Sequence, residues 1–283
     1  MSESTPHAPV GLLAGSGRFP IMFAQKAREL GIPVVGVGII GEAADELAPL
    51  CDRFHWAGLS KMGRVIRCFK GDGVREIVMA GKIQKVRLNT PYRLWNLLPD
   101  WRTFSWYFFR NRKDNRDDSL LLSVIAEFAR DDLTFRSALD FCPELLVKPG
   151  ILTKRGVSSS EQADIEFGWE MAKEMGRLDI GQSVAVREKA VLAVEAIEGT
   201  DRAILRAGEL CPRGGIVIVK VAKPQQDMRF DVPTVGVTTI ESMRKAGANV
   251  LAVEADRTIF IDQDDTIALA NRYGISIVAR KAA

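Results

Sequence analysis

Short apolar runs of the kind that form buried strands alternate with amphipathic helical stretches along most of this chain. The first run, GLLAG at 11–15, is followed by the helical pattern FPIMFAQKARELG at 19–31. This alternation predicts an α/β fold, in which parallel sheets are covered by helices. We expect strands at 11–15, 33–39, 53–58, 75–81, 183–187, 190–195, 215–220, 249–253 and 275–279, and helices at 19–31, 62–73, 118–130, 164–177, 200–209, 238–246 and 263–272.

A polar segment divides the chain into two regions of this kind. KPGILTKRGVSSSEQAD at 148–164 is rich in glycine and serine, which is typical of a linker. We therefore expect an N-terminal parallel-sheet domain at 1–132, a linker at 133–163 and a C-terminal α/β domain at 164–283.

Composition excludes several kinds of chemistry. The only histidines are His7 and His55, and the four cysteines are far apart and form no CxxC pair. This argues against zinc sites, histidine-rich binuclear metal centres, Ser-His-Asp triads and disulfide frameworks. A hydrolase of this composition would depend on carboxylates, lysines, backbone amides and a hard metal ion. The net charge of +3 gives no global argument for a nucleic-acid partner.

The N-terminal sequence MSESTPHAPV lacks an apolar signal core, so we expect a cytoplasmic location. We expect no membrane-spanning helix, because no apolar run reaches the length of about 18 residues that one requires. The segment YRLWNLLPDWRTFSWYFFRNR at 92–112 is aromatic and flanked by arginine. It suits either a membrane-surface or acyl-binding element, with Trp106 in contact with acyl chains, or a helix packed on its neighbours.

Glycines and a lysine follow two of the expected N-terminal strands. Gly15, Ser16 and Gly17 follow the first strand, and Gly81 and Lys82 end the strand at 75–81. Because ligands of open α/β sheets bind at the carboxyl ends of strands, we expect these residues to face one crevice and contact phosphate. A tight turn and a solvated lysine are the alternatives. An NAD site is disfavoured, since a proline occupies the third glycine position and no clear ribose-binding acid ends the next strand.

The segment AVEAIEGTDRAI at 193–204 passes from a strand into a helix. Thr200 or Asp201 could cap this helix, or the same loop could hold a phosphate with its metal. Glu195 lies in the apolar run, where a carboxylate needs a partner.

Both signs of charge follow the strand at 215–220. KVAKPQQDMRFDVPTVG at 220–236 is typical of either a solvated loop or a site for phosphate and a metal. Its charged residues are Lys220, Lys223, Asp227, Arg229 and Asp231.

Four segments together carry a resemblance to a known family. GLLAGSGRFP, MAGKIQK, LDIGQSVAVREKAVLAVEAIEGTD and KVAKPQQDMRFDVPTVG resemble the LpxI family, UDP-2,3-diacylglucosamine pyrophosphatases of lipid A biosynthesis. The resemblance covers about residues 10–280. It implies hydrolysis of UDP-2,3-diacylglucosamine to UMP and 2,3-diacylglucosamine 1-phosphate (lipid X) with a divalent metal, usually Mg²⁺. It also implies a Rossmann-like N-terminal domain, a catalytic C-terminal domain, substrate in the cleft between them, and a homodimer.

The family motif assigns roles to the loop at 220–236. Asp227 would hold Mg²⁺ or orient the attacking water, and these two roles stay open. Lys220, as a catalytic residue, together with Lys223 and Arg229, would neutralise phosphate charge. Asp231 would support the site or pair with Arg229. The alternative function is a non-catalytic nucleotide-sugar or lipid-binding protein on the same frame. The pyrophosphatase that the resemblance implies could contact a membrane surface, as a cytoplasmic protein peripheral on the inner membrane.

Overall fold

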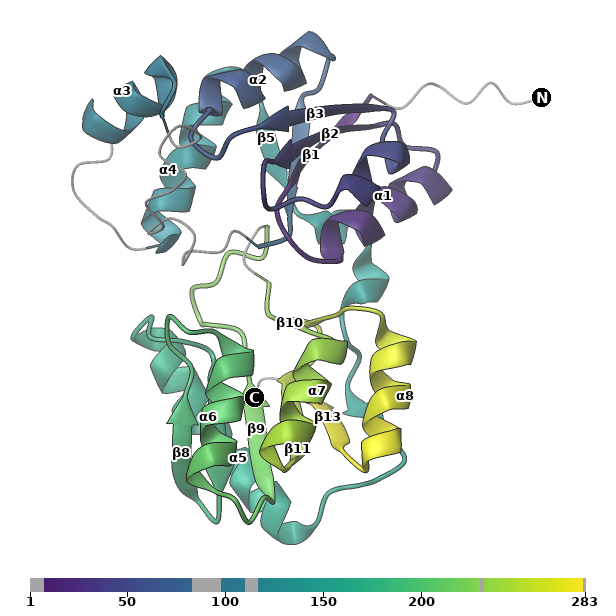
Figure 1. The fold of residues 1–283 in the computed structure, drawn as a ribbon, viewed down its shortest axis with the longest axis vertical. Coiled ribbons are helices and arrows are strands. Elements are labelled where there is room, and N and C mark those ends of the chain that lie inside the picture. The colour runs from purple at the N-terminus through teal and green to yellow at the C-terminus, as the bar shows by residue number, and fades with distance from the viewer. Residues whose placement is uncertain (1–7, 83–97, 110–116, 230–231, 282–283) are drawn as a thin grey trace. The chain divides into compact units, whose positions relative to one another are not determined.

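The computed structural model describes residues 8–82, 98–109, 117–229 and 232–281. The chain divides into two compact units, Met1–Cys142 and Pro143–Ala283, each built on its own sheet (Figure 1). Both units combine strands with covering helices, so the expected α/β class is confirmed. No helix in the described ranges is long and apolar enough to cross a bilayer.

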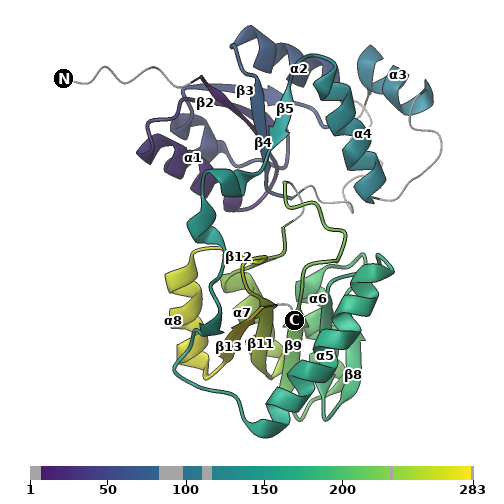
Figure 2. The same ribbon diagram turned by 180° about the vertical axis from the view of Figure 1, so that it is seen from behind.

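The first unit holds a five-stranded, wholly parallel sheet in the order β3-β2-β1-β4-β5. Helix α1 covers one face, and α2 and α4 cover the other, with α3 beside α2 (Figures 1 and 2). This strand order is that of a Rossmann-like sheet. The elements are β1 Val10–Ala14, α1 Phe19–Glu29, β2 Val34–Ile39, the 3₁₀ segment η1 Asp45–Leu50, β3 Arg53–Ala57, α2 Met62–Gly71, β4 Glu76–Ala80, α3 Trp101–Phe109, α4 Asp117–Ala129, and β5 Thr134–Arg136.

Apolar side chains of the strands pack against α2 and α4 in the first unit. Val35, Val37 and Ile77 join Phe69 of α2 and Phe128 of α4 in one buried cluster. Trp106 of α3 belongs to the same cluster and is only 6% exposed. Trp106 is therefore packed on its neighbours and does not present its ring to a lipid, whereas Trp101 and Phe104 of the same helix are exposed. Residues 92–97 and 110–112 lie outside the described part of the chain.

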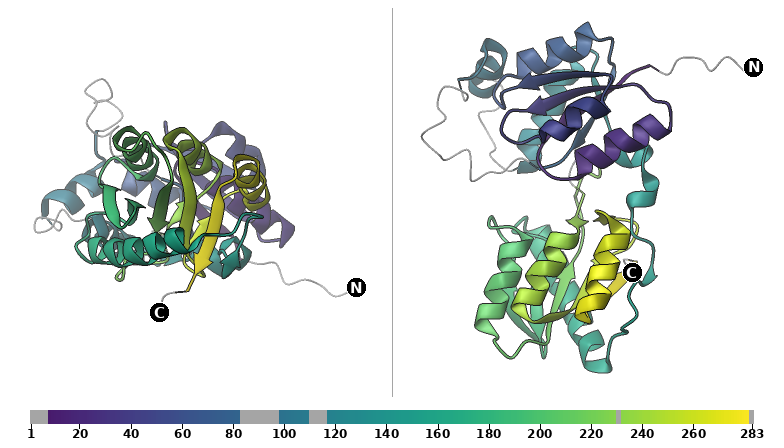
Figure 3. Two further views of the ribbon diagram at one scale, coloured as in Figure 1. Left: turned by 90° about the horizontal axis from the view of Figure 1, so that it is seen from below. Right: turned by 45° about the vertical axis from the view of Figure 1, so that its right-hand side comes forward.

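The second unit holds a six-stranded mixed sheet in the order β6-β13-β11-β9-β7-β8. Helix α5 covers one face, and α6, α7 and α8 cover the other (Figure 2 and the left view of Figure 3). The elements are β6 Gly150–Ile151, α5 Ser159–Arg177, β7 Ser183–Arg187, β8 Ala190–Val194, α6 Thr200–Leu210, β9 Ile216–Lys220, β10 Thr234–Val235, α7 Val237–Ala246, β11 Ala248–Glu254, β12 Ile259–Phe260, α8 Gln263–Tyr273 and β13 Ser276–Arg280.

Successive apolar side chains of the central strands pack alternately on the two faces of this sheet. Val217 and Val219 of β9 belong to the buried cluster that contains Ile165 of α5. Ile216 and Ile218 belong to the opposite cluster, with apolar residues of α6, α7 and α8. Because successive strand side chains point to opposite faces, the run Ile216–Val219 is buried on both sides.

The sheet of the second unit is mixed, unlike the wholly parallel sheet of the first unit. β7 pairs antiparallel with both β8 and β9. The turn between β7 and β8 is Glu188 and Lys189, both with positive φ of 52° and 57°, which suits a two-residue hairpin. The buried carboxylate of Asp164 accepts hydrogen bonds from the backbone amides of both residues, at 2.9 and 2.7 Å, and so stabilises a turn without glycine.

The segment predicted to be a linker, 133–163, differs from the structure at both ends. Residues 134–136 form β5 and pair with β4 of the first sheet, while 150–151 form β6 and pair with β13 of the second. α5 also begins at Ser159, where Ser158 and Glu161 form a capping box. Hydrogen bonds to distant strands define these elements, so local composition alone did not indicate them.

Close packing of α6 on α7 generates a stability prediction. A Cβ added at Gly208 would lie 2.5 Å from the Cα of Ala246, whereas one added at Gly71 meets no described atom within 4 Å. We expect Gly208→Ala to lower the free energy of unfolding by about 1–3 kcal/mol, because backbone atoms cannot yield as side chains do. The matched control Gly71→Ala should be neutral or stabilising by up to about 1 kcal/mol. Urea denaturation followed by circular dichroism measures both, and equal stability of the two variants would contradict the prediction.

Candidate active site

Lys220, the last residue of β9, is buried with its charged end at the carboxyl edge of the sheet. Its side chain is 3% exposed. Nζ donates hydrogen bonds to Thr200 Oγ1 at 2.8 Å and to the carbonyl oxygen of Thr234 at 3.1 Å. Since Thr200 opens α6, the ammonium group lies at the N-terminal end of that helix, where anions are also favoured.

Glu195 extends this arrangement. Thr200 Oγ1 donates to Glu195 Oε1 at 2.9 Å, so Thr200 links the buried lysine to a buried carboxylate. The expectation that Glu195 needs a partner is confirmed. Glu195 Oε2 and Asp201 Oδ1 are buried and have no hydrogen-bond partner within the described part of the chain. Buried carboxylate oxygens usually have one, so both point to a water, a cation or a donor on a ligand.

Gly181 permits the position of Glu195. A Cβ at residue 181 would lie 2.0 Å from the carbonyl oxygen of Glu195. The backbone of 195 is also fixed by a hydrogen bond from its amide to the carbonyl of Ser183, at 2.8 Å. The sequence indicated Glu195 only as an isolated acid in an apolar run, and no sequence signal identified its contact with Thr200.

Glu254, the last residue of β11, anchors the chain as it leaves β9. Its side chain is fully buried, and Oε2 accepts from Lys173 Nζ at 2.6 Å and from the backbone amide of Ala222 at 2.8 Å. Lys173 Nζ also donates to the carbonyl of Ala222 at 3.1 Å. The pair therefore satisfies both backbone groups of Ala222, and so fixes where the loop after Lys220 begins.

Lys223 forms an ion pair with Asp179, which follows the C-terminus of α5. Its Nζ lies 2.6 Å from Asp179 Oδ1, and its backbone amide donates to Gln226 Oε1 at 2.8 Å. The side chain is only 14% exposed. Lys223 therefore helps to hold the loop in place, whatever contact it makes with a ligand.

Asp227 and Arg229 form a pair within the same loop. Arg229 Nε donates to Asp227 Oδ1 at 3.0 Å, Nη2 donates to Oδ2 at 2.6 Å, and the Arg229 amide donates to Oδ1 at 3.0 Å. Hydrogen bonds from the Arg229 side chain are the main reason that the pKa of Asp227 lies below its ordinary value. Asp231, the predicted alternative partner of Arg229, lies outside the described residues.

Asp227 is the residue that the sequence predicted as a metal ligand. In the described ranges there is no group of three or more His, Cys, Asp or Glu side chains placed to hold a metal ion. Both oxygens of Asp227 already accept hydrogen bonds from Arg229. Mg²⁺ nevertheless suits such a site, since it commonly keeps several waters and binds through one or two carboxylates together with substrate phosphates.

The glycine loops of the first unit lie together at the carboxyl ends of β1 and β4, as expected. Ser16 and Lys82 form an antiparallel bridge, with backbone hydrogen bonds of 2.8 and 2.9 Å. A Cβ on Gly15 would lie 2.6 Å from the Lys82 carbonyl, and one on Gly81 would lie 2.7 Å from the Ser16 carbonyl. Backbone packing thus requires glycine at 15 and 81. Gly17, with φ of +100°, meets no described atom within 4 Å at its Cβ position.

The predicted site residues therefore form two clusters. Gly15, Ser16, Gly17, Gly81 and Lys82 belong to the first unit. Thr200, Asp201, Lys220, Lys223, Asp227 and Arg229 belong to the second. Of these, Lys220 and Thr200 contact each other at the carboxyl end of β9, whereas Asp227 and Arg229 pair with each other further along the loop. Together they define an α/β protein of two units, each with polar groups at the carboxyl ends of its strands.

Comparison with known proteins identifies the family. Residues 9–145 match the LpxI N-terminal domain and residues 148–278 match the LpxI C-terminal domain. The chain is 32% identical over 281 residues to the UDP-2,3-diacylglucosamine pyrophosphatase LpxI of Caulobacter vibrioides, covering 95% of this chain and 96% of that protein. This chain belongs to the LpxI family.

Similarities to solved structures are weak. The biotin carboxylase subunit of a pyruvate carboxylase is 13% identical, covers 73% of this chain and 42% of its own, and has a TM-score of 0.27. The biotin carboxylase domain of the Hydrogenobacter thermophilus 2-oxoglutarate carboxylase is 14% identical, with coverage of 74% and 42% and a TM-score of 0.25. At these TM-scores the similarities say nothing about fold or function.

The Asp227–Arg229 pair generates a titration prediction. Arg229→Ala removes the side-chain hydrogen bonds and the positive charge but keeps the amide hydrogen bond to Oδ1, so it should raise the pKa of Asp227 toward its ordinary value. In the wild type the folded pKa is the lower one. The pair therefore stabilises the fold above the ordinary pKa, and this contribution is lost as pH falls through the depressed value.

Carboxyl ¹³C shifts, assigned with Asp227→Asn, measure this titration. Arg177→Ala is the matched control, because Arg177 pairs with Glu174 elsewhere in the same unit. An unchanged Asp227 midpoint in Arg229→Ala would contradict the assignment.

Proposed function

We propose that this chain hydrolyses the pyrophosphate bond of UDP-2,3-diacylglucosamine, giving UMP and 2,3-diacylglucosamine 1-phosphate in lipid A biosynthesis. The observation that carries the proposal is the 32% identity, over 95% of the chain, to a protein named as that pyrophosphatase. The buried Lys220 at the end of β9, joined through Thr200 to Glu195, supports it, because a pyrophosphate needs cations beside it and groups that position water.

The reaction sets the roles of the residues. Water attacks one phosphorus in line, a new P–O bond forms, the bond from that phosphorus to the bridging oxygen breaks, and one proton is released. Lys220 would stabilise the charge that grows on the phosphoryl oxygens. Thr200 and Glu195 would hold its Nζ in place, through the hydrogen bonds of 2.8 and 2.9 Å that join the three side chains. Asp201, at the start of α6, would contact the substrate or its metal.

Asp227 would act as a metal ligand or orient the attacking water, and Arg229 would bind phosphate. In this proposal the substrate replaces the internal pair: Asp227 turns to the metal or water, and Arg229 to a phosphoryl oxygen. Mg²⁺ would supply charge neutralisation of the phosphate oxygens when bound. Lys223, held by Asp179, would add positive charge from a fixed position. Gly15, Ser16, Gly17, Gly81 and Lys82 would bind substrate from the first unit.

We expect Asp227→Ala to retain the fold and to lower kcat by at least about 100-fold, because a carboxylate that positions water or metal acts mainly in the transition state. Release of UMP from UDP-2,3-diacylglucosamine is measured over a Mg²⁺ titration after treatment with EDTA. Asp256→Ala is the matched control, since Asp256 pairs with Lys148 in the same unit. Near wild-type turnover in Asp227→Ala with Mg²⁺ present would refute the role of Asp227.

Lys220→Met removes the buried charge and keeps most of the side-chain volume. We expect this variant to lower kcat/KM by about 100-fold or more. Thr200→Val should lower kcat/KM less, because Lys220 would keep its hydrogen bond to the Thr234 carbonyl. An unchanged kcat/KM in Lys220→Met would exclude Lys220 from catalysis.

One assay distinguishes the pyrophosphatase from the alternative function, a non-catalytic nucleotide-sugar or lipid-binding protein. Metal-dependent release of UMP in ¹⁸O water, followed by phosphorus NMR, supports the enzyme. The label should enter 2,3-diacylglucosamine 1-phosphate if attack occurs at the sugar-side phosphorus, and UMP if it occurs at the other. Binding of the substrate without release of UMP under any metal condition would favour the alternative.

A further inference from the structure

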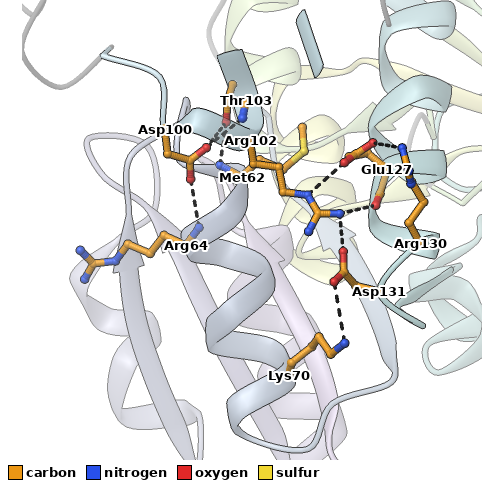
Figure 4. A network of polar contacts seen from close by, with 9 residues as sticks. All are labelled: Met62, Arg64, Lys70, Asp100, Arg102, Thr103, Glu127, Arg130 and Asp131. Carbon is orange, nitrogen blue, oxygen red and sulfur yellow. Dashed lines mark hydrogen bonds and ion pairs between the residues drawn. The ribbon is translucent and has the colours of Figure 1, made fainter. Parts of the chain in front are cut away.

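Helix α3 is fixed against α2 and α4 by a network of polar contacts (Figure 4). Asp100 accepts hydrogen bonds from the Thr103 amide at 2.9 Å and from the Arg64 amide at 3.1 Å, so it joins the starts of α3 and α2. Arg102 donates from Nε to Glu127 Oε1 at 3.0 Å and forms an ion pair with Asp131. The N-terminal turn of α3 is therefore held in a defined position by both neighbouring helices.

This rigid helix presents aromatic side chains to solvent. Trp101 is 78% exposed and stacks on Phe104, with ring centroids 5.8 Å apart and an interplanar angle of 21°. The exposure contrasts with Trp106, five residues along the same helix, which is buried in the core. A largely exposed tryptophan on an ordered helix leaves apolar surface in water, which is typical of an interaction site.

Positive charge borders the aromatic pair. The exposed residues of α2 are Arg64, Arg67, Lys70 and Gly71, so the three charged ones recur every third residue on one face. Arg67 and Lys70 line a hollow of about 360 Å³ together with Trp101. In Figure 4 the guanidinium group of Arg64 points away from the network.

The acids of this region are largely engaged by the chain itself. Glu127 is only 4% exposed, Asp100 accepts hydrogen bonds from two backbone amides, and Asp131, which is 21% exposed and lines the same hollow, pairs with Arg102 and Lys70. Asp132 is exposed beside them, but the exposed charges that α2 presents next to Trp101 are all basic. We define the α2–α3 surface as Arg64, Arg67, Lys70, Trp101 and Phe104.

We propose that the α2–α3 surface binds the surface of an anionic lipid bilayer. A tryptophan ring suits the boundary between headgroups and acyl chains, and arginine and lysine beside it are attracted to anionic headgroups. The charge complementarity favours this occupant over a second copy of the chain, whose identical surface would carry the same positive charge. The proposal concerns docking and does not depend on hydrolysis.

Vesicle co-sedimentation without substrate tests the proposal. The full chain is mixed with vesicles of phosphatidylcholine alone, or of phosphatidylcholine with phosphatidylglycerol, at low and high salt. We expect binding to the anionic vesicles that weakens as salt rises. Arg64→Glu with Arg67→Glu should weaken the vesicle affinity by roughly tenfold or more, and Trp101→Ala should weaken it at every salt concentration.

Matched controls lie on α1, which covers the opposite face of the same sheet (Figure 1). Arg28 and Leu30 are exposed there, so Arg28→Glu and Leu30→Ala should bind vesicles as the wild type does. Thermal melts confirm that each variant is folded.

Three outcomes would overturn the proposal: no binding of the wild type to anionic vesicles, equal binding by the α2–α3 and α1 variants, or conversion of a dimer to a monomer by Trp101→Ala. The last result, from sedimentation velocity, would assign the surface to a second copy of the chain. UMP release is measured separately on a detergent-dispersed substrate. Retained turnover with lost vesicle binding separates failure of docking from failure of the enzymatic proposal.

Discussion

The ion pair between the buried Glu254 and the partly exposed Lys173 is the interaction on which the proposed active site depends. The pair makes hydrogen bonds to both the amide and the carbonyl of Ala222, two residues beyond Lys220. Ala222 is fully buried, so these backbone groups have the pair as partners in place of water. An unpaired charge there would cost several kcal/mol, about 3–5 by analogy with other buried pairs. Glu254 of β11 and Lys173 of α5 therefore fix the direction in which the loop that carries Asp227 leaves β9.

Two kinds of polar arrangement follow from that anchor. Lys220 and Glu195 are buried and are joined by hydrogen bonds through Thr200, so they keep one geometry before any ligand arrives. Asp227 and Arg229 lie further along, and their side chains are 27% and 41% exposed. Because the second pair meets water, separating its members costs far less than breaking a buried pair. In the proposed function, the fixed Lys220 would neutralise phosphate charge, and Asp227, in its exchangeable pair, would be released to bind a metal or water.

The sequence predicted most elements because long apolar runs are a strong local signal, as in Ile216–Val219. It missed β10, β12 and the hairpin geometry of β7 and β8, since strands of two residues have no period and pairing direction depends on turns. It also offered Trp106 as a contact for acyl chains, although that side chain is buried, because composition does not reveal which side of a helix is buried. The Lys223–Asp179 and Lys173–Glu254 contacts join residues 44 and 81 positions apart, beyond any local pattern.

The structure distinguishes glycines of the first unit that backbone packing requires from a glycine that packing does not explain. Gly15 and Gly81 are required because two backbones approach so closely that a Cβ would overlap a carbonyl. Their presence would be explained even in a protein that bound nothing. Gly17 differs: its φ of +100° favours glycine, yet the space beside it is open as far as the described atoms extend. It also precedes α1, which within the described residues has neither a side-chain cap nor an acid in its first turn. Among these glycines, Gly17 is therefore the one that has open space beside its backbone and lies next to a helix N-terminus. A phosphate is favoured at such a position.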